Sequence, residues 1–359
     1  MRMIPTKMIT ESMLLGKAIY GPNGDLLLPA GAKIIQYKAN LETLRIKHIY
    51  IIDDISQDID IQQVLSDDTK QEAIAAMKAA AKLFQPSAKN RQSIPNLPYD
   101  KLARYIAEDV WNKPAGGIDV SELRLNRQYP YGHELNVGIL AALIGRLFGL
   151  SCQALTDLCY SGLVHEIGFL NLPPDIVKKI GNEKLGDSEF SQYRQYPRIG
   201  YDLIKNNYGL SISTKANVLQ HREHFNGKGF PNYKQGEEIR FTARVLCIAD
   251  HFDELYSGRN VHLGKKSMKI YEIMEFIVAQ SGHYFDPDIV TIFSKNATLF
   301  PNGAIVRLNN GMKGIILSQN KDMMSRPVVR LLNDANGNPV KGTIDLLQHL
   351  TVFIDDVET

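Results

Sequence analysis

SGLVHEIGFLNLP, residues 161–173, places a histidine next to a glutamate near the end of an apolar run with helical spacing. A neutral imidazole and a carboxylate are both side chains that bind divalent metals. His165 and Glu166 are therefore candidate metal ligands. Two ligands do not complete a coordination shell, so we expect histidines and carboxylates from other helices to join them.

Three positions elsewhere in the chain supply such side chains. His133 and His221 lie in other helical stretches, and Asp250 directly follows the apolar run 245–249. A buried carboxylate without a partner costs several kcal/mol, so Asp250 requires a cation or an arginine nearby. Any single histidine is more simply explained as a hydrogen-bonded residue of the core or surface. The five candidates together favour a metal site.

Helical periodicity dominates residues 99–298. One face illustrates it, with side chains at intervals of three and four residues: His133, Val137, Leu140 and Ile144. This spacing is typical of amphipathic helices. We predict an all-α domain whose candidate ligands lie on separate helices.

Two short β regions flank this domain. Residues 1–62 alternate apolar runs such as 48–52 with Asn-Gly and Pro-Ala-Gly turns, which predicts a small N-terminal β module containing one short helix within 32–46. Residues 299–359 show the same alternation and predict a small C-terminal β-barrel or meander. The sequence therefore predicts a multidomain α+β protein with a central all-α domain.

Residues 63–98 connect the N-terminal module to the helical domain. The stretch 66–84 begins with acidic residues and continues with lysines, as an amphipathic helix does, and 86–98 has linker composition. The apolar face of the helix has four residues: Ile74, Met77, Ala81 and Phe84. Packing against the neighbouring domain is the simpler interpretation of this face. A dimer helix, and hence a homodimer, is the alternative.

Composition narrows the class of protein. A net charge of +2 over 359 residues argues against broad electrostatic capture of nucleic acid, so we expect no DNA partner. The three cysteines lie singly in apolar runs, as buried thiols of a reducing compartment do. The chain shows no signal peptide and no apolar stretch of the ~18 residues that span a membrane. We expect a cytoplasmic protein.

A series of motifs resembles one known family. In chain order they are HELNV (133–137), LVHEIG (163–168), PPDI (173–176), YPRIG (196–200), HREHFNGKGFP (221–231), EEI (237–239), ARV (243–245) and IADHFD (248–253). They follow the pattern of the HD-GYP branch of the HD superfamily, and the first 52 residues are similar to a β module that often precedes such domains. The H-E-x-x-H protease motif is excluded, because Phe169 stands where its second histidine is required.

The resemblance implies a function. HD-GYP proteins are similar in being phosphodiesterases that open cyclic di-GMP at a centre of two or three metals, which generate a hydroxide and neutralise phosphate charge. The implied ligand is cyclic di-GMP or a related nucleotide. The loop Gly229-Phe230-Pro231 stands where the family has a Gly-Tyr-Pro loop associated with docking to diguanylate-cyclase domains, so a signalling protein of that type is the implied partner.

Four of the family's ligand positions keep metal-binding side chains. His133, His165 and Asp250 match the family, and Glu166 replaces an aspartate with one extra methylene. Metal sites tolerate only ~0.2 Å in ligand distance, so coordination by Glu166 implies a shifted geometry. We expect one divalent metal (Fe, Mn or Zn) at these four positions, with His221 as a further candidate.

Other positions of the centre depart from the family's pattern. Tyr196 and Arg222 replace two histidines, and a permanently charged guanidinium cannot ligate a cation. We therefore expect the second metal site to be lost. Tyr129 stands in place of a glutamate for a third metal, and Phe169 in place of a lysine that contacts phosphate. With Glu166, these are the degenerate positions of the centre.

Three basic side chains remain as candidates for contact with a ligand: Arg222, Arg259 and His221. Arg259 matches a phosphate-contacting arginine of the family, whereas His262 replaces a second one. Arg222 has two interpretations. It acts as an internal cation near Glu166 and Asp250, with a planar fork that also suits phosphate, or it points outward or pairs with a neighbouring glutamate.

Three functions remain open. The first is a degenerate HD-GYP protein with at most one metal, which acts as a binding or regulatory module in cyclic-dinucleotide signalling with little or no hydrolysis. The second is a working phosphohydrolase with a single metal, acting on cyclic di-GMP or another nucleotide. The third is a scaffold without a ligand, in which the β modules and the loop 229–231 contact other proteins.

Overall fold

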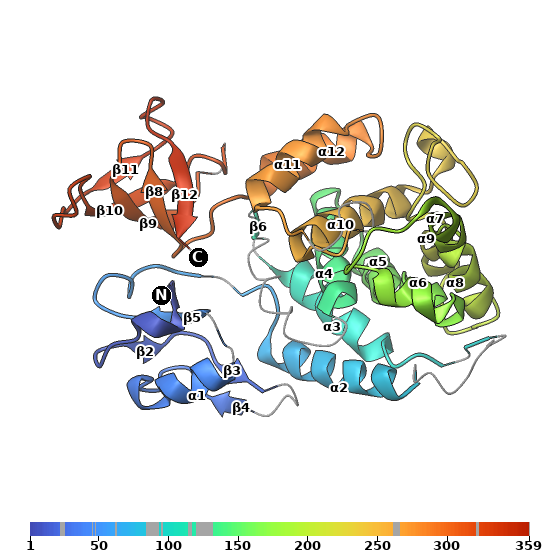
Figure 1. Ribbon diagram of the computed structural model, residues 1–359, viewed down its shortest axis with the longest axis horizontal. Helices are drawn as coiled ribbons and strands as arrows, with labels where there is room; N and C mark the ends of the chain where they lie inside the picture. Colours follow the sequence, from blue (N-terminus) through green and yellow to red (C-terminus); the bar gives the residue numbers. More distant parts are fainter. Residues whose placement is uncertain are drawn as a thin grey trace. The chain divides into compact units, whose positions relative to one another are not determined.

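The computed structural model describes residues 1–21, 26–44, 46, 48–61, 63–83, 93–94, 96–113, 117–119, 132–260, 266–320 and 323–358. The chain forms two compact units (Figure 1). The β unit comprises Met1–Gln63, Asp119–Ser121 and Lys295–Thr359, and the helical unit comprises Val64–Ile118 and Glu122–Ser294.

The first part of the β unit is built from short elements. In chain order they are β1 (Arg2–Pro5), η1 (Thr6–Met8), β2 (Leu14–Leu15), β3 (Ile19–Tyr20), β4 (Leu26–Leu28), η2 (Ile35–Tyr37), α1 (Lys38–Thr43) and β5 (His48–Ile52). β5 lies between β1 and β2 in an antiparallel sheet, and β3 pairs with β4. Ile4, Leu15 and Ile51 lie in the core beneath them. The expected short helix is α1.

The second part of the β unit is a five-stranded antiparallel sheet with the order β11-β10-β9-β8-β12. Its elements and the preceding strand are β7 (Ala297–Thr298), β8 (Ile305–Leu308), β9 (Lys313–Ser318), β10 (Val328–Asn333), β11 (Thr343–Asp345) and β12 (Ile354–Glu358). The turn between β8 and β9 holds Gly311 at φ +83°, in the left-handed region that favours glycine. The sheet matches the expected meander.

The two parts of the β unit share a core and an ion pair. Ile59 and Ile61 pack with Ile315 of β9 in one apolar cluster. The Arg330 guanidinium of β10 donates to both carboxylate oxygens of Asp58. Segments 272 residues apart in the chain therefore fold as one body.

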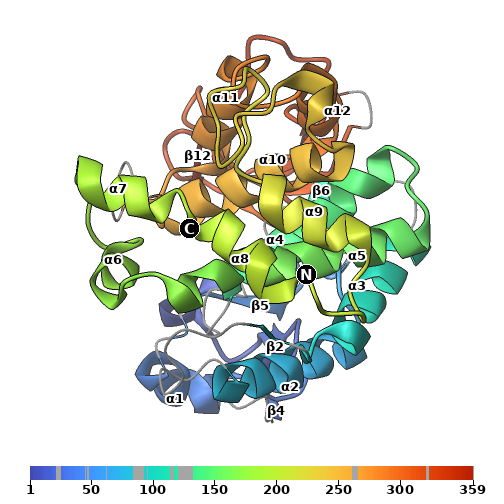
Figure 2. The same cartoon turned by 90° about the vertical axis from the view of Figure 1, so that its right-hand side faces the viewer.

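The rest of the chain is helical apart from the short strand β6. In chain order its elements are α2 (Asp67–Leu83), α3 (Asp100–Asn112), β6 (Ile118–Asp119), α4 (Gly132–Leu147), α5 (Cys152–Val164), η4 (Ile167–Asn171), α6 (Pro174–Lys179), α7 (Asp187–Tyr193), α8 (Tyr196–Ile204), α9 (Ile212–Gln220), η5 (Gly236–Glu238), α10 (Phe241–Ser257), α11 (Ile270–Ala279) and α12 (Pro287–Asn296). α4 packs against α5 and α10, and α9 packs against α5, α8 and α10 (Figures 1 and 2). These helices surround the predicted ligands.

The α+β architecture with a central helical domain is confirmed, but two details differ from expectation. The buried face of α2, which packs near α3, includes Ala73, Ala76 and Ala80 beside Met77, whereas Ile74 and Ala81 are only half-buried. Phe84 and most of the expected linker lie outside the described residues. Cys152 is only partly buried, whereas the other two cysteines are buried as expected.

None of the helices in the described ranges combines the length and the apolar character that crossing a bilayer requires.

Two glycines let α4 and α5 approach closely enough to place their histidines together. A Cβ added at Gly162 would lie 2.4 Å from the backbone nitrogen of Gly138. A Cβ added at Gly138 would lie 2.9 Å from the carbonyl oxygen of Cys159. Neither contact is one that a side chain can relieve by moving, so the helix spacing depends on both glycines.

We predict that Gly162→Ala lowers the free energy of unfolding of the helical unit by about 2 kcal/mol or more. Overpacking against a backbone costs about 3 kcal/mol, which exceeds the gain of about 1 kcal/mol in helix propensity. Scanning calorimetry measures the effect. The control is Gly186→Ala, whose Cβ would meet nothing nearer than 3.7 Å. Equal transition temperatures for the two variants would contradict the prediction.

Candidate metal centre

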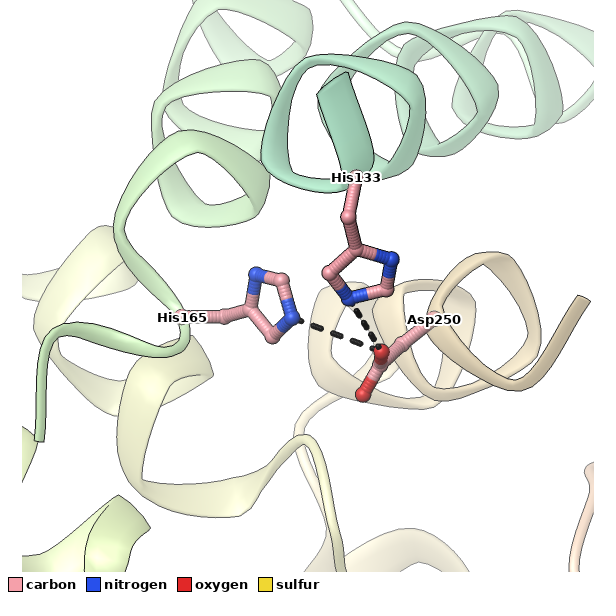
Figure 3. A group of neighbouring side chains, drawn as sticks. All are labelled: His133, His165 and Asp250. Atoms are coloured by element: carbon pink, nitrogen blue, oxygen red, sulfur yellow. Dashed lines mark ion pairs between the residues drawn. The ribbon is translucent and has the colours of Figure 1, made fainter. Parts of the chain in front are cut away.

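Three side chains from three helices meet inside the helical unit (Figure 3). His133 lies in the first turn of α4, His165 caps the C-terminal end of α5, and Asp250 lies within α10. The Nε2 atom of each histidine lies 3.3 Å from Oδ1 of Asp250. The three side chains are at most 2% exposed. Three of the four predicted ligands therefore converge on one point.

The donor atoms of this cluster fit a divalent cation. Nε2 of His133, Nε2 of His165 and Oδ1 of Asp250 have no hydrogen-bond partner within the described part of the chain. A ligand atom of each lies within 4.8 Å of those of the other two. A buried polar atom without a partner costs about 1–3 kcal/mol, which coordination would offset. Two imidazoles and a carboxylate suit Mn, Fe or Zn.

Hydrogen bonds behind the histidines orient them. Nδ1 of His165 donates to the carbonyl oxygen of Gly162 at 2.7 Å, which leaves the lone pair on Nε2. Nδ1 of His133 lies 2.7 Å from Oδ2 of Asp253, and Asn136 donates to Oδ1 of the same carboxylate at 2.8 Å. Such partners fix the tautomer and raise the basicity of a ligating histidine.

Glu166 stands at the edge of the cluster. Its Oε1 lies 3.6 Å from Nε2 of His133, and its Oε2 accepts a hydrogen bond of 2.8 Å from Arg259. The longer side chain thus reaches the cluster with one oxygen while the other is held by a guanidinium. Oε1 is the atom that Glu166 can offer to a metal.

Arg222 is the internal cation of the centre. Its side chain is 5% exposed, and Nη2 lies 3.0 Å from Oδ2 of Asp250. Nη1 and Nη2 both donate to the carboxylate of Glu254, and Nε donates to the Tyr196 hydroxyl at 2.8 Å. The expected partner Glu166 is instead bound to Arg259. The guanidinium is thus bonded to Asp250, Glu254 and Tyr196 within the protein, and the predicted phosphate contact of Arg222 stays a prediction.

Tyr196 joins Arg222 to His221. The Tyr196 hydroxyl lies 2.7 Å from Nε2 of His221, whose Nδ1 donates to the carbonyl oxygen of Val218 at 2.8 Å. Nε2 of His221 therefore accepts a hydrogen bond from the Tyr196 hydroxyl. Burial and the nearby His165 lower the pKa of His221 well below its usual value, so this imidazole is neutral. His221 is buried, and both of its nitrogens are bonded within the protein.

The electrostatics of the cluster favour a positive charge. Burial opposes the charged form of Asp250, yet Arg222 and His165 hold the pKa of its carboxyl well below the usual range. Burial and Arg259 oppose protonation of His133, but the surrounding carboxylates raise its pKa well above the ordinary value. The site therefore binds positive charge, either as a proton or as a cation.

The ion-paired groups around the cluster have a net negative charge. The carboxylates that contact a histidine or a guanidinium are Glu166, Asp250, Asp253 and Glu254. The two guanidinium groups are Arg222 and Arg259. Four negative charges against two positive leave −2 when the histidines are neutral. One divalent cation balances this charge.

A pocket of about 230 Å³ opens beside Glu166 and Arg259. The aromatic rings of Tyr99 and Phe169 and several aliphatic side chains line it, and Glu134 supplies another carboxylate. Arg259 is 31% exposed at its side chain, so it is the predicted ligand-contacting arginine that a ligand can reach.

The loop 229–231 lies against the core. A Cβ at Gly229 would lie 2.1 Å from the backbone nitrogen of His224, so only glycine fits there. Phe230 is 7% exposed, and its ring packs against Tyr196 and Tyr193 at centroid distances of 6.3 and 6.2 Å. The Phe230 side chain therefore packs in the core, and the expected role of the loop in docking a partner stays a prediction.

The remaining predicted positions fall in two groups. Phe169 packs against Tyr196, with ring centroids 4.6 Å apart. Tyr129 and His262 lie outside the described residues.

Asp253 and Glu254 are not among the predicted site residues, although the spacing of Asp250 and Asp253 places them one helical turn apart on α10. Asp253 contacts His133 in α4, and Glu254 contacts Arg222 after α9. The spacing along α10 does not reveal these partners.

Two histidines and an aspartate at the centre of a helical domain define a candidate metal-binding protein. Comparison with family models gives its relatives. Residues 119–289 match the model of the HD domain, and residues 305–359 match that of the KOW domain associated with the HD domain. Residues 119–289 are therefore similar to the HD domain, and residues 305–359 to the KOW domain that accompanies it. The resemblance seen in the sequence motifs is confirmed.

Known relatives share part of this chain. "Cyclic di-GMP phosphodiesterase PA4108" of Pseudomonas aeruginosa is 28% identical over 258 residues, 72% of this chain and 61% of that protein. "Cyclic di-GMP phosphodiesterase response regulator RpfG" of Xanthomonas campestris is 31% identical over 152 residues, 42% of this chain and 39% of that protein. The chain thus spans less than two thirds of the length of these relatives.

One solved structure covers most of the chain. Bd1817, an HDG"Y"P protein from Bdellovibrio bacteriovorus, is similar with a TM-score of 0.48 and 13% identity, over 81% of this chain and 97% of that chain.

We predict that Asp253→Asn weakens binding of Mn²⁺ about 10- to 100-fold, because loss of the carboxylate behind His133 lowers the basicity of that ligand. Isothermal titration calorimetry measures the affinity. Asp288→Asn is the control, since Asp288 is exposed in the first turn of α12. The same affinity in both variants would show that Asp253 does not support a ligand.

We predict that Arg222→Met destabilises the helical unit by about 3–5 kcal/mol, because it leaves Asp250 and Glu254 without their buried partner. Thermal unfolding monitored by circular dichroism measures the loss. Arg240→Met replaces an exposed arginine and is expected to change stability by no more than about 0.5 kcal/mol. A small effect at Arg222 would mean that its guanidinium is dispensable.

Proposed function

We propose that this protein binds a cyclic dinucleotide such as cyclic di-GMP through a single divalent metal, and that it hydrolyses the ligand far more slowly than a phosphodiesterase with two metals. It thereby acts as a binding or regulatory module of cyclic-dinucleotide signalling. The one metal is held by His133, His165, Asp250 and Oε1 of Glu166.

One observation supports this proposal: the Arg222 guanidinium forms buried ion pairs with two carboxylates of the centre, where a second cation would otherwise be needed. It lies against Asp250 and Glu254, and through Tyr196 it is connected to the lone pair of His221. A second metal would need the Asp250 oxygen and the His221 nitrogen that these contacts use. The net charge of −2 among the ion-paired groups supports the same stoichiometry.

The loss of a second cation explains a slow reaction. In two-metal sites the ions stabilise both the attacking and the leaving oxygen of a phosphodiester. A single ion supplies Lewis acidity and positive charge at one position. Arg222 cannot supply the other, because its nitrogens are bound to Asp250, Glu254 and Tyr196. Among the described residues that line the pocket, Arg259 is the cationic side chain available for a phosphate oxygen.

We expect the purified protein to bind one equivalent of Mn²⁺, Fe²⁺ or Zn²⁺ and to bind cyclic di-GMP in calorimetry only when metal is present. His165→Ala removes an imidazole ligand and is expected to abolish both. Metal analysis by mass spectrometry and a titration with cyclic di-GMP check these outcomes. Two equivalents of metal, or steady hydrolysis of cyclic di-GMP that His165→Ala abolishes, would overturn the proposal.

A second function, a phosphohydrolase with one metal, is favoured by the unpaired donors. Nε2 of His133, Nε2 of His165 and Oδ1 of Asp250 remain free for an ion, as far as the described residues show. The substrate would then be another nucleotide. Turnover in a panel of phosphodiesters and nucleotides by protein with one metal would favour it, and a protein that binds no metal would remove it.

A further inference from the structure

The lining of the pocket beside the metal centre includes a polar atom that the described residues leave unpaired. Oε2 of Glu134 is buried and has no hydrogen-bond partner among the residues that the structure describes. Glu134 lies in the first turn of α4, directly after His133. A buried acceptor without a partner costs about 1–3 kcal/mol, so a ligand that donates a hydrogen bond to it gains affinity.

The chemistry of this atom selects the ligand group that approaches it. An ionised carboxylate only accepts hydrogen bonds, so its partner must present N–H or O–H donors. A phosphate would be repelled by the like charge. The phosphate of a nucleotide therefore lies toward the metal cluster and Arg259, and an uncharged part with donors lies toward Glu134.

The rest of the lining suits a flat ring. Tyr99 and Phe169 contribute aromatic rings, and aliphatic side chains complete the pocket. A volume of about 230 Å³ is below the range of roughly 300–1,000 Å³ of pockets for drug-sized ligands, so it accommodates one nucleobase rather than a whole dinucleotide. Such a pocket favours a base that has two adjacent donors on one edge.

Guanine has that edge. Its N1–H and its exocyclic amino group lie side by side and match the two oxygens of a carboxylate. Adenine presents an acceptor at N1 beside one amino donor, so it leaves a carboxylate oxygen facing a lone pair. We propose that Glu134 is a specificity-determining residue that selects guanine over adenine in this pocket. The proposal rests on the proposed function, that a nucleotide phosphate binds at the metal centre.

The test compares two ligands that have the same phosphates and differ in their bases. Full-length protein loaded with Mn²⁺ is titrated with cyclic di-GMP and with cyclic di-AMP. We expect the wild type to bind cyclic di-GMP at least tenfold more tightly. Glu134→Gln is expected to lower the affinity for cyclic di-GMP about tenfold or more and to reduce the preference, with unchanged metal stoichiometry and melting temperature. Glu275→Gln, at an exposed position of α11, is the control and keeps the preference.

The possible outcomes separate the two proposals. Equal loss of affinity for both ligands in Glu134→Gln, or no loss, would overturn the role of Glu134 while leaving the binding function standing. A wild-type protein that binds both ligands equally would do the same. Binding of neither ligand by the metal-loaded protein would overturn the proposed function and this inference together.

Discussion

The carboxylate of Asp250 is the group on which the centre depends. It is fully buried, and a buried carboxylate is stable only beside compensating charge or donors. Two histidines face one of its oxygens and Arg222 faces the other. Helices α4, α5 and α10 therefore meet around one negative charge. The glycines that allow α4 and α5 to approach closely are part of the same arrangement, since they set the distance between His133 and His165.

The two oxygens of the Asp250 carboxylate differ in the kind of cation that can lie beside them. On the side of the histidines, the two Nε2 atoms have no hydrogen-bond partner among the described residues and can accept a metal. On the side of Arg222, the cation is covalently part of the chain and is bonded to Glu254 and Tyr196 as well. A permanent guanidinium stabilises the packing of α10 without depending on metal supply. The proposed function follows if this guanidinium leaves room for one exchangeable cation beside Asp250.

The pocket lies directly beside this centre. Glu166 and Arg259 form its boundary with the metal cluster, and Glu134 lies next to a ligand histidine in the chain. Phosphate and base would therefore be recognised within a few residues of each other. The residues described for the metal cluster and the pocket all belong to the helical unit, not to the β unit. The core of the β unit and the Arg330–Asp58 pair join the first and last segments of the chain into one body.

The sequence by itself determined the α+β architecture and the candidate ligands, because spacing of three and four residues defines a helix face, and ligand chemistry depends on residue type. It did not determine which candidates meet. Only the tertiary structure showed that Arg222 turns inward to Asp250, that Glu166 pairs with Arg259, and that Phe230 lies in the core. These choices depend on side-chain direction and on partners far apart in the chain, which local periodicity does not contain.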